Sequence, residues 1–194
     1  MVNQTVVDNQ KLKRILTYIS HQRHPQQLRM MFLCSWHGMR SINFAYLQVK
    51  DVYTTAGTVR DRIRLDGHKN KGQQTCTYYL NHQIRQEFKR YLSYIRQRDT
   101  EWNAETYLFI SQKQGHPYHR VSISRLFARI YRHFGIQGAS HLGRHLFVSR
   151  LINAGTNICL VQRLVNHRHI TTTQHYFNCN EQMLLRAVEQ VRLS

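Results

Sequence analysis

The sequence predicts an α+β domain that is mainly α-helical and carries a small three-stranded antiparallel sheet. Apolar residues recur with the three- and four-residue spacing of helices before residue 49 and after residue 80. Between these positions apolar and polar residues alternate, which is the two-residue period of strands. A length of 194 residues suits one principal domain with its own core.

The chain has a strong excess of positive charge. Lysine and arginine number 28 against 10 aspartate and glutamate, a formal net charge of +18. A surface this basic attracts polyanions, and nucleic acid is the leading partner. A membrane surface would also fit the charge, but the sequence has no lysine-rich amphipathic segment and no lipidation motif. Its longest apolar run, residues 30–36, falls far short of the ~20 residues that span a bilayer, so we expect a cytoplasmic protein.

The cysteines and histidines form no metal-binding motif. Four cysteines are scattered without a C-x-x-C pair, and we interpret them as free thiols. His141 and His145 are four residues apart on a predicted helix, but no glutamate follows His141 as the H-E-x-x-H motif requires. We therefore expect no metal and no cofactor.

Two helices are predicted before residue 40. Asp8 or Asn9 can cap the first, and Pro25 suits the first turn of the second, which ends at Gly38. Arg40 would then begin a third helix, RSINFAYL, where backbone N–H groups also face anions. On position alone, Arg40 would be an exposed or carboxylate-paired side chain.

Three strands are predicted between residues 49 and 80, with the sequences VKDVYTT, VRDRIRL and QTCTYYL. In the second strand Arg60, Arg62 and Arg64 share one face, which is either solvated or pressed against a phosphate backbone. We favour DNA contact by these arginines. The connection DGHKNKGQQ is a hairpin tip that carries Lys69 and Lys71, and a lysine there can reach a neighbouring site.

The remaining chain is predicted to be mostly helical. Asn81 caps the helix NHQIRQEFKRYLSYIRQR, and a short strand, YLFI, leads to the helix SISRLFARIYRHFG. Ser140 can cap HLGRHLFVSRLINAG, which ends at Gly155. His167 lies at the end of the buried helix NICLVQRLVNH, and residues 181–193 form an amphipathic C-terminal helix.

Residues 140–176 contain side chains that suit phosphoryl transfer. His141 and Arg144 are three residues apart, so they project from the same side of a first helical turn. Histidine can move a proton, arginine can bind a phosphate through two hydrogen bonds, and Tyr176 can attack phosphorus. Taken singly, each also has a structural explanation, such as a histidine at a helix end or a half-buried tyrosine.

Taken in order, these residues resemble the catalytic domain of the tyrosine recombinases, the phage integrase family. The family pattern of arginine, lysine, H-x-x-R, histidine and tyrosine is matched by HGMRS at Arg40, the hairpin lysine, HLGRH, NH at His167 and HITTTQHY at Tyr176. The resemblance covers nearly the whole chain. In its length the chain is similar to short members of the family such as the fimbrial switch invertases.

Three positions depart from the family pattern. Asn43 stands where an acidic residue is common, and Asn166 stands where glycine usually precedes the histidine. The lysine alignment is ambiguous. Tyr79 occupies the position where the family usually has proline. Lys71 is preferred over Lys69 because it lies eight residues before Tyr79, whereas Lys69 would need a longer hairpin. Lys69 then remains as a DNA-binding residue.

The resemblance implies a DNA breaking-rejoining fold and a site-specific recombinase or integrase that needs neither metal nor ATP. Tyr176 would become linked to a DNA 3′ phosphate while Lys71 protonates the departing 5′ oxygen. The two arginines would hold the phosphate, His141 would take part in proton transfer, and His167 would support the phosphate or the tyrosine. The implied catalytic residues are Arg40, Lys71, His141, Arg144, His167 and the nucleophile Tyr176.

The resemblance also implies an assembly. Family members form tetramers on two duplex DNA sites and donate the C-terminal helix to a neighbour, a role open to residues 181–193, although packing on their own core is the alternative. Only about eight residues precede the first helix. We therefore expect a single catalytic domain, 1–194, without the N-terminal core-binding domain, unless the sequence is part of a longer integrase. An accessory DNA-bending protein would help it. Its setting would be the nucleoid, on a bacterial, phage or plasmid genome.

Two other functions use the same residues. A type IB topoisomerase-like relaxase would relax supercoiled DNA without a preferred site. A DNA-binding regulator on the same fold would lack a catalytic residue, and none of the six is missing from the sequence.

Overall fold

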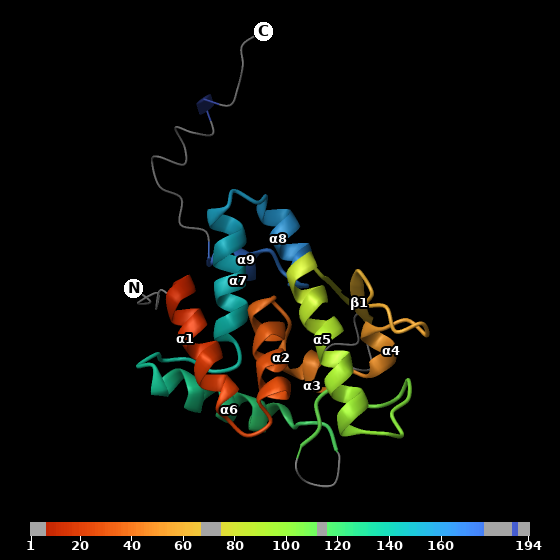
Figure 1. Cartoon of the computed structure of the whole chain (residues 1–194). Helices are drawn as coiled ribbons and strands as arrows, with labels where there is room; N and C mark the ends of the chain where they lie inside the picture. The colour runs from red at the N-terminus through yellow and green to blue at the C-terminus, as the bar shows by residue number, and fades with distance from the viewer. Residues whose placement is uncertain (1–6, 67–74, 112–115, 177–187, 190–194) are drawn as a thin grey trace. The chain divides into compact units, whose positions relative to one another are not determined.

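The computed structural model of the chain describes residues 7–66, 75–111, 116–176 and 188–189 (Figure 1). The chain forms two compact units, residues 1–147 and residues 148–194, each described by itself. Lys69, Lys71 and nearly all of the predicted C-terminal helix lie outside the described residues. No helix among the described residues is long and apolar enough to cross a bilayer.

The first two helices begin where the sequence predicts, and the second ends just before the predicted Gly38. α1 (Asn9–Ser20) is capped by Asp8, whose carboxylate accepts a hydrogen bond from the Lys11 amide at 2.6 Å. α2 (Pro25–Trp36) has proline in its first turn. It lies between α1 and α5 in Figure 1 and buries most of its residues.

The first predicted strand is wrong, because VKDVYTT begins with the short helix α4 (Val49–Val52). A capping box starts this helix: the Gln48 amide donates to the Asp51 carboxylate at 2.9 Å, and the Gln48 side chain accepts in return. The amide of Val49 donates to the Thr106 carbonyl at 2.9 Å, so a loop rather than a strand pairs with this segment. Local capping therefore outweighed the strand propensity of the valines.

The other two predicted strands form the sheet. β1 (Arg62–Leu65) and β2 (Cys76–Tyr79) pair antiparallel, with Ile63 opposite Tyr78. The sheet of the described residues thus has two strands rather than three. Residues 107–110, predicted as a short strand, make only isolated bridges at Tyr107 and Ile110.

Helices make up most of the rest of the chain, which confirms the predicted fold class. α5 is capped by Asn81 as predicted, and α6 begins two residues earlier than predicted, after His119. α7 begins at Leu142, so His141 rather than Ser140 immediately precedes it. The remaining elements are α3 (Ser41–Ala45), α5 (His82–Arg98), α6 (Arg120–His133), α7 (Leu142–Asn153), α8 (Ile158–Leu164) and α9 (Thr171–Gln174).

An aromatic cluster in the first unit joins α2 to α6. The ring of Phe32 lies 5.2 Å from that of Phe127 and 5.3 Å from that of Tyr131, measured between centroids. The indole N–H of Trp36 donates to the Tyr131 hydroxyl at 3.0 Å, so this buried polar pair is satisfied. The cluster fixes the C-terminal end of α2, from which the candidate site begins.

Candidate active site

Arg40 lies on a tight turn between α2 and α3. Gly38 has φ +84°, a left-handed conformation that costs glycine little and that ends α2 as predicted. Arg40 occupies the N-cap position of α3, where its carbonyl accepts hydrogen bonds from the amides of Asn43 and Phe44 at 2.9 and 3.1 Å. The predicted helix N-terminus is therefore confirmed. Asn43 is 2% exposed and neutral, so this departure adds no negative charge to the turn.

The start of α7 packs closely against this turn. A Cβ at Gly143 would lie 2.5 Å from the Ser35 hydroxyl, and a Cβ at Gly38 would lie 2.6 Å from a ring carbon of Phe147. The Ser35 hydroxyl also donates to the Ser140 carbonyl at 2.9 Å. Glycines at both positions thus allow residues far apart in sequence to meet without a gap.

Arg144 points back to the turn that carries Arg40. Its side chain is 5% exposed, and its Nη1 donates to the carbonyl of Gly38. A buried guanidinium needs such partners because removing its charge from water is costly. This hydrogen bond holds Arg144 beside residues 38–40.

His141 lies in the electrostatic field of both arginines. Its pKa is lowered by desolvation and then by the positive charges of Arg144 and Arg40. The hydrogen bond from Arg144 to Gly38, two residues before Arg40, and the three-residue spacing of His141 and Arg144 place these three residues around one turn. The neutral imidazole that results can accept a proton.

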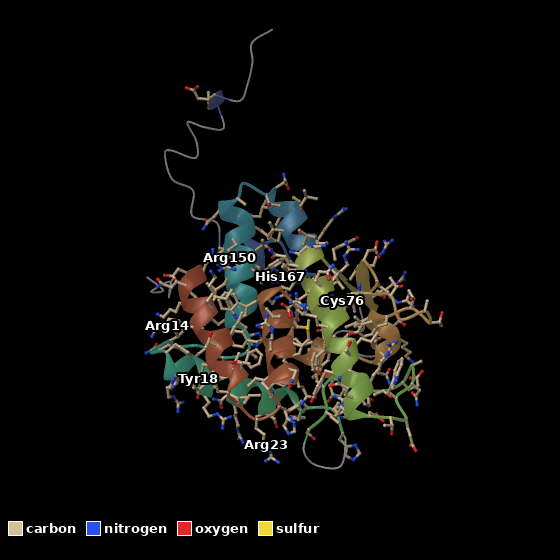
Figure 2. All side chains as sticks on the ribbon, in the orientation of Figure 1. Arg14, Tyr18, Arg23, Cys76, Arg150 and His167 are labelled. Carbon is tan, nitrogen blue, oxygen red and sulfur yellow. The ribbon has the colours of Figure 1, made fainter. Side chains whose placement is uncertain are left out.

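Two residues on β2 also face these arginines, and the sequence prediction did not include them. Burial raises the pKa of Cys76, which is labelled in Figure 2, and that of Tyr78, whereas Arg40 and Arg144 oppose both shifts. Cys76 and Tyr78 are two residues apart, so they share the buried face of the strand. That alternation was the signal in the sequence, but only the structure shows which residues the face meets.

His37 connects the Arg40 turn to the end of β2. Its Nε2 lies 2.9 Å from the carbonyl of Tyr79 and, because a carbonyl only accepts, carries the proton. The imidazole also packs on Phe147 with 5.5 Å between ring centroids. Burial lowers its pKa, and the bond to Tyr79 partly opposes that shift. His37 thus links the turn that carries Arg40 to the C-terminal end of β2.

The three arginines of the second predicted strand are exposed, as the alternation indicates. Arg62 and Arg64 belong to β1, and Arg60 precedes it, while Ile63 and Leu65 are buried. Arg60 donates to the carbonyl of Lys50 at 3.3 Å, and Arg62 lies 3.4 Å from the carboxylate of Asp61. Exposed pairs of this kind contribute little to stability, so the arginines can contact another molecule.

His167 belongs to the second unit and follows a left-handed residue. Asn166 has φ +53°, which asparagine tolerates better than most residues and which glycine adopts freely. This explains how asparagine can stand where the family usually has glycine. The His167 carbonyl accepts a hydrogen bond from Gln162 at 3.2 Å, and its Nδ1 lies 2.9 Å from the hydroxyl of Thr173.

Thr173 links His167 to the turn that carries Tyr176. The threonine is fully buried, and its carbonyl accepts a hydrogen bond from the Tyr176 amide at 3.1 Å. Tyr176 follows α9 and is half-buried. The sequence prediction passed over Thr173 because one hydroxyl in the run ITTTQHY carries no pattern of its own. Figure 2 labels His167.

The candidate residues therefore divide between the two units. Arg40, His141 and Arg144 gather in the first, whereas His167 and Tyr176 lie within one short segment of the second. Their union in a single site stays a prediction, as does the role of Lys71.

Comparison with known proteins identifies the family. The model of the phage integrase family matches residues 5–183. The chain belongs to the phage integrase family. Members similar to this chain include Transposase A of transposon Tn554 from Staphylococcus aureus, which is 26% identical over 172 residues, covering 85% of this chain and 46% of the transposase. The tyrosine recombinase XerD of Rickettsia prowazekii is 27% identical over 192 residues, which is 92% of this chain and 60% of XerD.

Solved structures agree with the family fold. The XerH site-specific recombinase bound to its difH substrate superposes with a TM-score of 0.70 and 22% identity, covering 96% of this integrase-family chain and 54% of XerH. The chain spans about half to three-fifths of the length of these relatives. The similarity therefore includes almost all of the chain but only part of each relative.

Proposed function

We propose that the chain is a site-specific DNA recombinase that cleaves and rejoins strands through a 3′-phosphotyrosine intermediate. The gathering of Arg40, Arg144 and His141 between the end of α2 and the start of α7 is the main support, because it concentrates positive charge beside a neutral imidazole. Family membership and the order of the later residues, His167 and Tyr176, add to it.

In the proposed reaction the Tyr176 hydroxyl attacks phosphorus and the bond to the 5′ oxygen breaks. A free tyrosine has a pKa of about 10 and is a poor nucleophile at neutral pH. Arg40 and Arg144 would bind the non-bridging oxygens and stabilise the charge that develops on the pentacovalent phosphate. Lys71 would give its proton to the departing 5′ oxygen. Attack by a 5′ hydroxyl of a second duplex reverses these steps and joins the recombinant strand.

The two histidines would have different tasks. His141, held neutral by its surroundings, can take the proton that Tyr176 loses. His167 would contact the phosphate or the tyrosine through Nε2, because its Nδ1 is already engaged by Thr173.

Duplex DNA is the proposed partner. XerH was solved bound to its difH substrate and the Tn1549 transposon integrase in complex with transposon right end DNA, and the net charge of +18 suits DNA here. Arg60, Arg62, Arg64 and Lys69 would contact the phosphate backbone. Four protomers would assemble on two sites, exchanging the helix of residues 181–193 and helped by a DNA-bending protein, in the nucleoid of a host that carries a mobile element.

Trapping the covalent intermediate tests the proposal. The 194-residue chain would be mixed with nicked suicide duplexes that contain the flanks of its own gene, and a denaturation-resistant protein–DNA adduct is expected. Tyr176→Phe should bind the duplex and form no adduct.

Three results would contradict the proposal. An adduct from Tyr176→Phe would mean that another residue is the nucleophile. Binding by the wild-type chain without any adduct would favour a regulator. Relaxation of supercoiled DNA at random sites would favour a relaxase. Separate Lys71→Ala and Lys69→Ala variants then identify the catalytic lysine, because only one of them should abolish cleavage.

A further inference from the structure

A cavity of about 330 Å³ lies beside the first half of α5, and none of the candidate catalytic residues that the structure describes is among those that line it. One wall is the turn before β1, and the other is the first half of α5. The residues that line the cavity are Gly57, Thr58, Val59, His82, Arg85, Gln86 and Lys89.

The α5 wall of this cavity is basic. His82, Arg85 and Lys89 are three and four residues apart, so they project from one side of the helix. No carboxylate is among the lining residues, and Glu87 pairs instead with Arg29 at 2.7 Å. The positive charge of the cavity is therefore not neutralised from within.

Arg85 has an unused donor. Its Nε is shielded from solvent and has no hydrogen-bond partner among the described residues. Buried N–H groups are nearly always paired, so an unpaired one needs an explanation. At this atom the Arg85 guanidinium is therefore not held by a partner within the described residues, which leaves the side chain able to turn toward an anion in the cavity.

The opposite wall is a well-ordered turn. The amides of Gly57 and Thr58 donate to the carbonyl and the hydroxyl of Thr54 at 2.9 and 3.1 Å, and the Thr54 amide donates to the Thr58 carbonyl at 2.8 Å. Gly57 has φ +76°, and a Cβ there would lie 3.1 Å from Nη2 of Arg96. The turn thus lies directly against α5 and leaves the Thr58 side chain exposed.

The turn that lines the cavity leads directly along the chain into the basic strand β1. Val59 lines the cavity, and Arg60 and Arg62 follow along the chain. Arg62 pairs with Tyr79, three residues before His82 at the start of α5. The arginines of this strand therefore lie close in sequence to residues that line the cavity.

We propose that this cavity binds a backbone phosphate of duplex DNA, distinct from the phosphate that Tyr176 attacks. Arg85 and Lys89 supply the charge, and His82 and the Thr58 hydroxyl supply further hydrogen bonds. Such a contact positions the duplex without reading its sequence. The proposal rests on DNA being the partner, but it does not depend on the cleavage chemistry.

The test compares two double variants that remove the same charge. Arg85→Gln with Lys89→Gln empties the cavity of its two strong cations. Lys13→Gln with Arg14→Gln removes two exposed cations from α1 and is the matched control. Both are made in a Tyr176→Phe chain, and DNA affinity is measured as a function of salt.

The cavity variant should bind DNA about tenfold more weakly, and the slope of log affinity against log salt should fall by about 1. The control should keep the wild-type slope. In ethylation interference, one phosphate outside the cleavage position should matter for the wild-type chain and not for the cavity variant. Arg85→Lys, which keeps the charge, should retain most of the affinity and shows that the fold is intact.

Equal salt slopes for the cavity variant and wild type would overturn the proposal. An equal loss of DNA affinity in the control variant would also overturn it, because the effect would then come from net charge and not from the cavity. A nucleoside monophosphate that binds the cavity more tightly than DNA does would assign it to a free nucleotide. With Tyr176 intact, failure to cleave at saturating DNA counts against the proposed recombinase and leaves the cavity untouched. Failure to bind DNA at all counts against both.

Discussion

At the scale of single residues, the candidate site depends on side chains that hold the reacting groups. Thr173 contacts His167 through its hydroxyl and the Tyr176 amide through its carbonyl. Because both contacts lie within one segment of the second unit, they orient these two residues relative to each other. Because a hydroxyl can donate or accept, this bond orients the imidazole in either of its tautomers.

Thr173→Val should slow strand cleavage about five- to tenfold, the effect of losing one hydrogen bond worth about 1 kcal/mol. Valine keeps the shape of the fully buried side chain, so DNA affinity should hardly change. Single-turnover cleavage of a suicide duplex measures the rate. Thr173→Ser keeps the hydroxyl and should retain most of the cleavage rate. Equal rates for Thr173→Val and wild type would show that the contact to His167 does not contribute to cleavage.

Three histidines of the first unit should make folding stability depend on pH. Burial is the largest cause of the lowered pKa of His37, His141 and His145. The unfolded chain, with histidine pKa values of ~6.5, then takes up protons before the folded chain does. Stability should therefore be full above this pH and fall as the pH drops through and below it.

Urea unfolding at pH 7.5 and pH 5.5 measures this dependence. His37→Gln keeps a donor for the Tyr79 carbonyl and cannot titrate, so the variant should lose less stability between the two pH values than wild type does. A wild-type stability that rises on acidification would contradict the direction of all three shifts.

At the scale of elements, the junction between α2 and α7 positions the arginines. Gly38 and Gly143 allow the close approach, and the hydrogen bond from Arg144 to the Gly38 carbonyl depends on it. His37 adds the link to β2. The junction has little room for change because neighbours on both sides contact the same turn.

Gly38→Ala should destabilise the protein by about 2–4 kcal/mol and lower cleavage with it. An added Cβ would suffer both the strain of φ +84° and a 2.6 Å approach to Phe147. Gly135→Ala is the matched control, since Gly135 also has positive φ, +64°, but nothing within 4 Å. Its cost should be about 1 kcal/mol, from backbone strain alone. Urea unfolding measures both variants, and equal costs would show that Phe147 moves aside.

At the scale of the whole molecule, the net charge governs how the protein meets DNA. With +18 distributed over the chain, binding should release many counterions. One part of this charge is the arginine face in and before β1, and another is the basic wall of the α5 cavity.

DNA affinity should fall at least about a hundredfold between about 50 and 200 mM salt, because several phosphate contacts weaken together. Fluorescence anisotropy with a labelled duplex, repeated over a salt series, measures the slope. Lys13→Gln with Arg14→Gln gives the background effect of charge alone. Affinity that is insensitive to salt would contradict a binding mode based on the phosphate backbone.

Local sequence signals predicted much of the fold. Asp8, Pro25, Gly38 and Asn81 mark helix ends through hydrogen bonds and dihedral preferences that act within a few residues, and all four are confirmed. The strand predicted at VKDVYTT failed because the capping box of Gln48 outweighed the valines.

By itself the sequence determined the mainly helical class, the exposed arginine face and the membership of the phage integrase family, and six catalytic residues stay its prediction. Only the tertiary structure decided what surrounds those residues. Arg144 meets Gly38 across more than a hundred positions of sequence, and Cys76 and Tyr78 face the arginines through a strand pairing. Contacts of this kind depend on packing between distant segments, for which the sequence has no periodic signal.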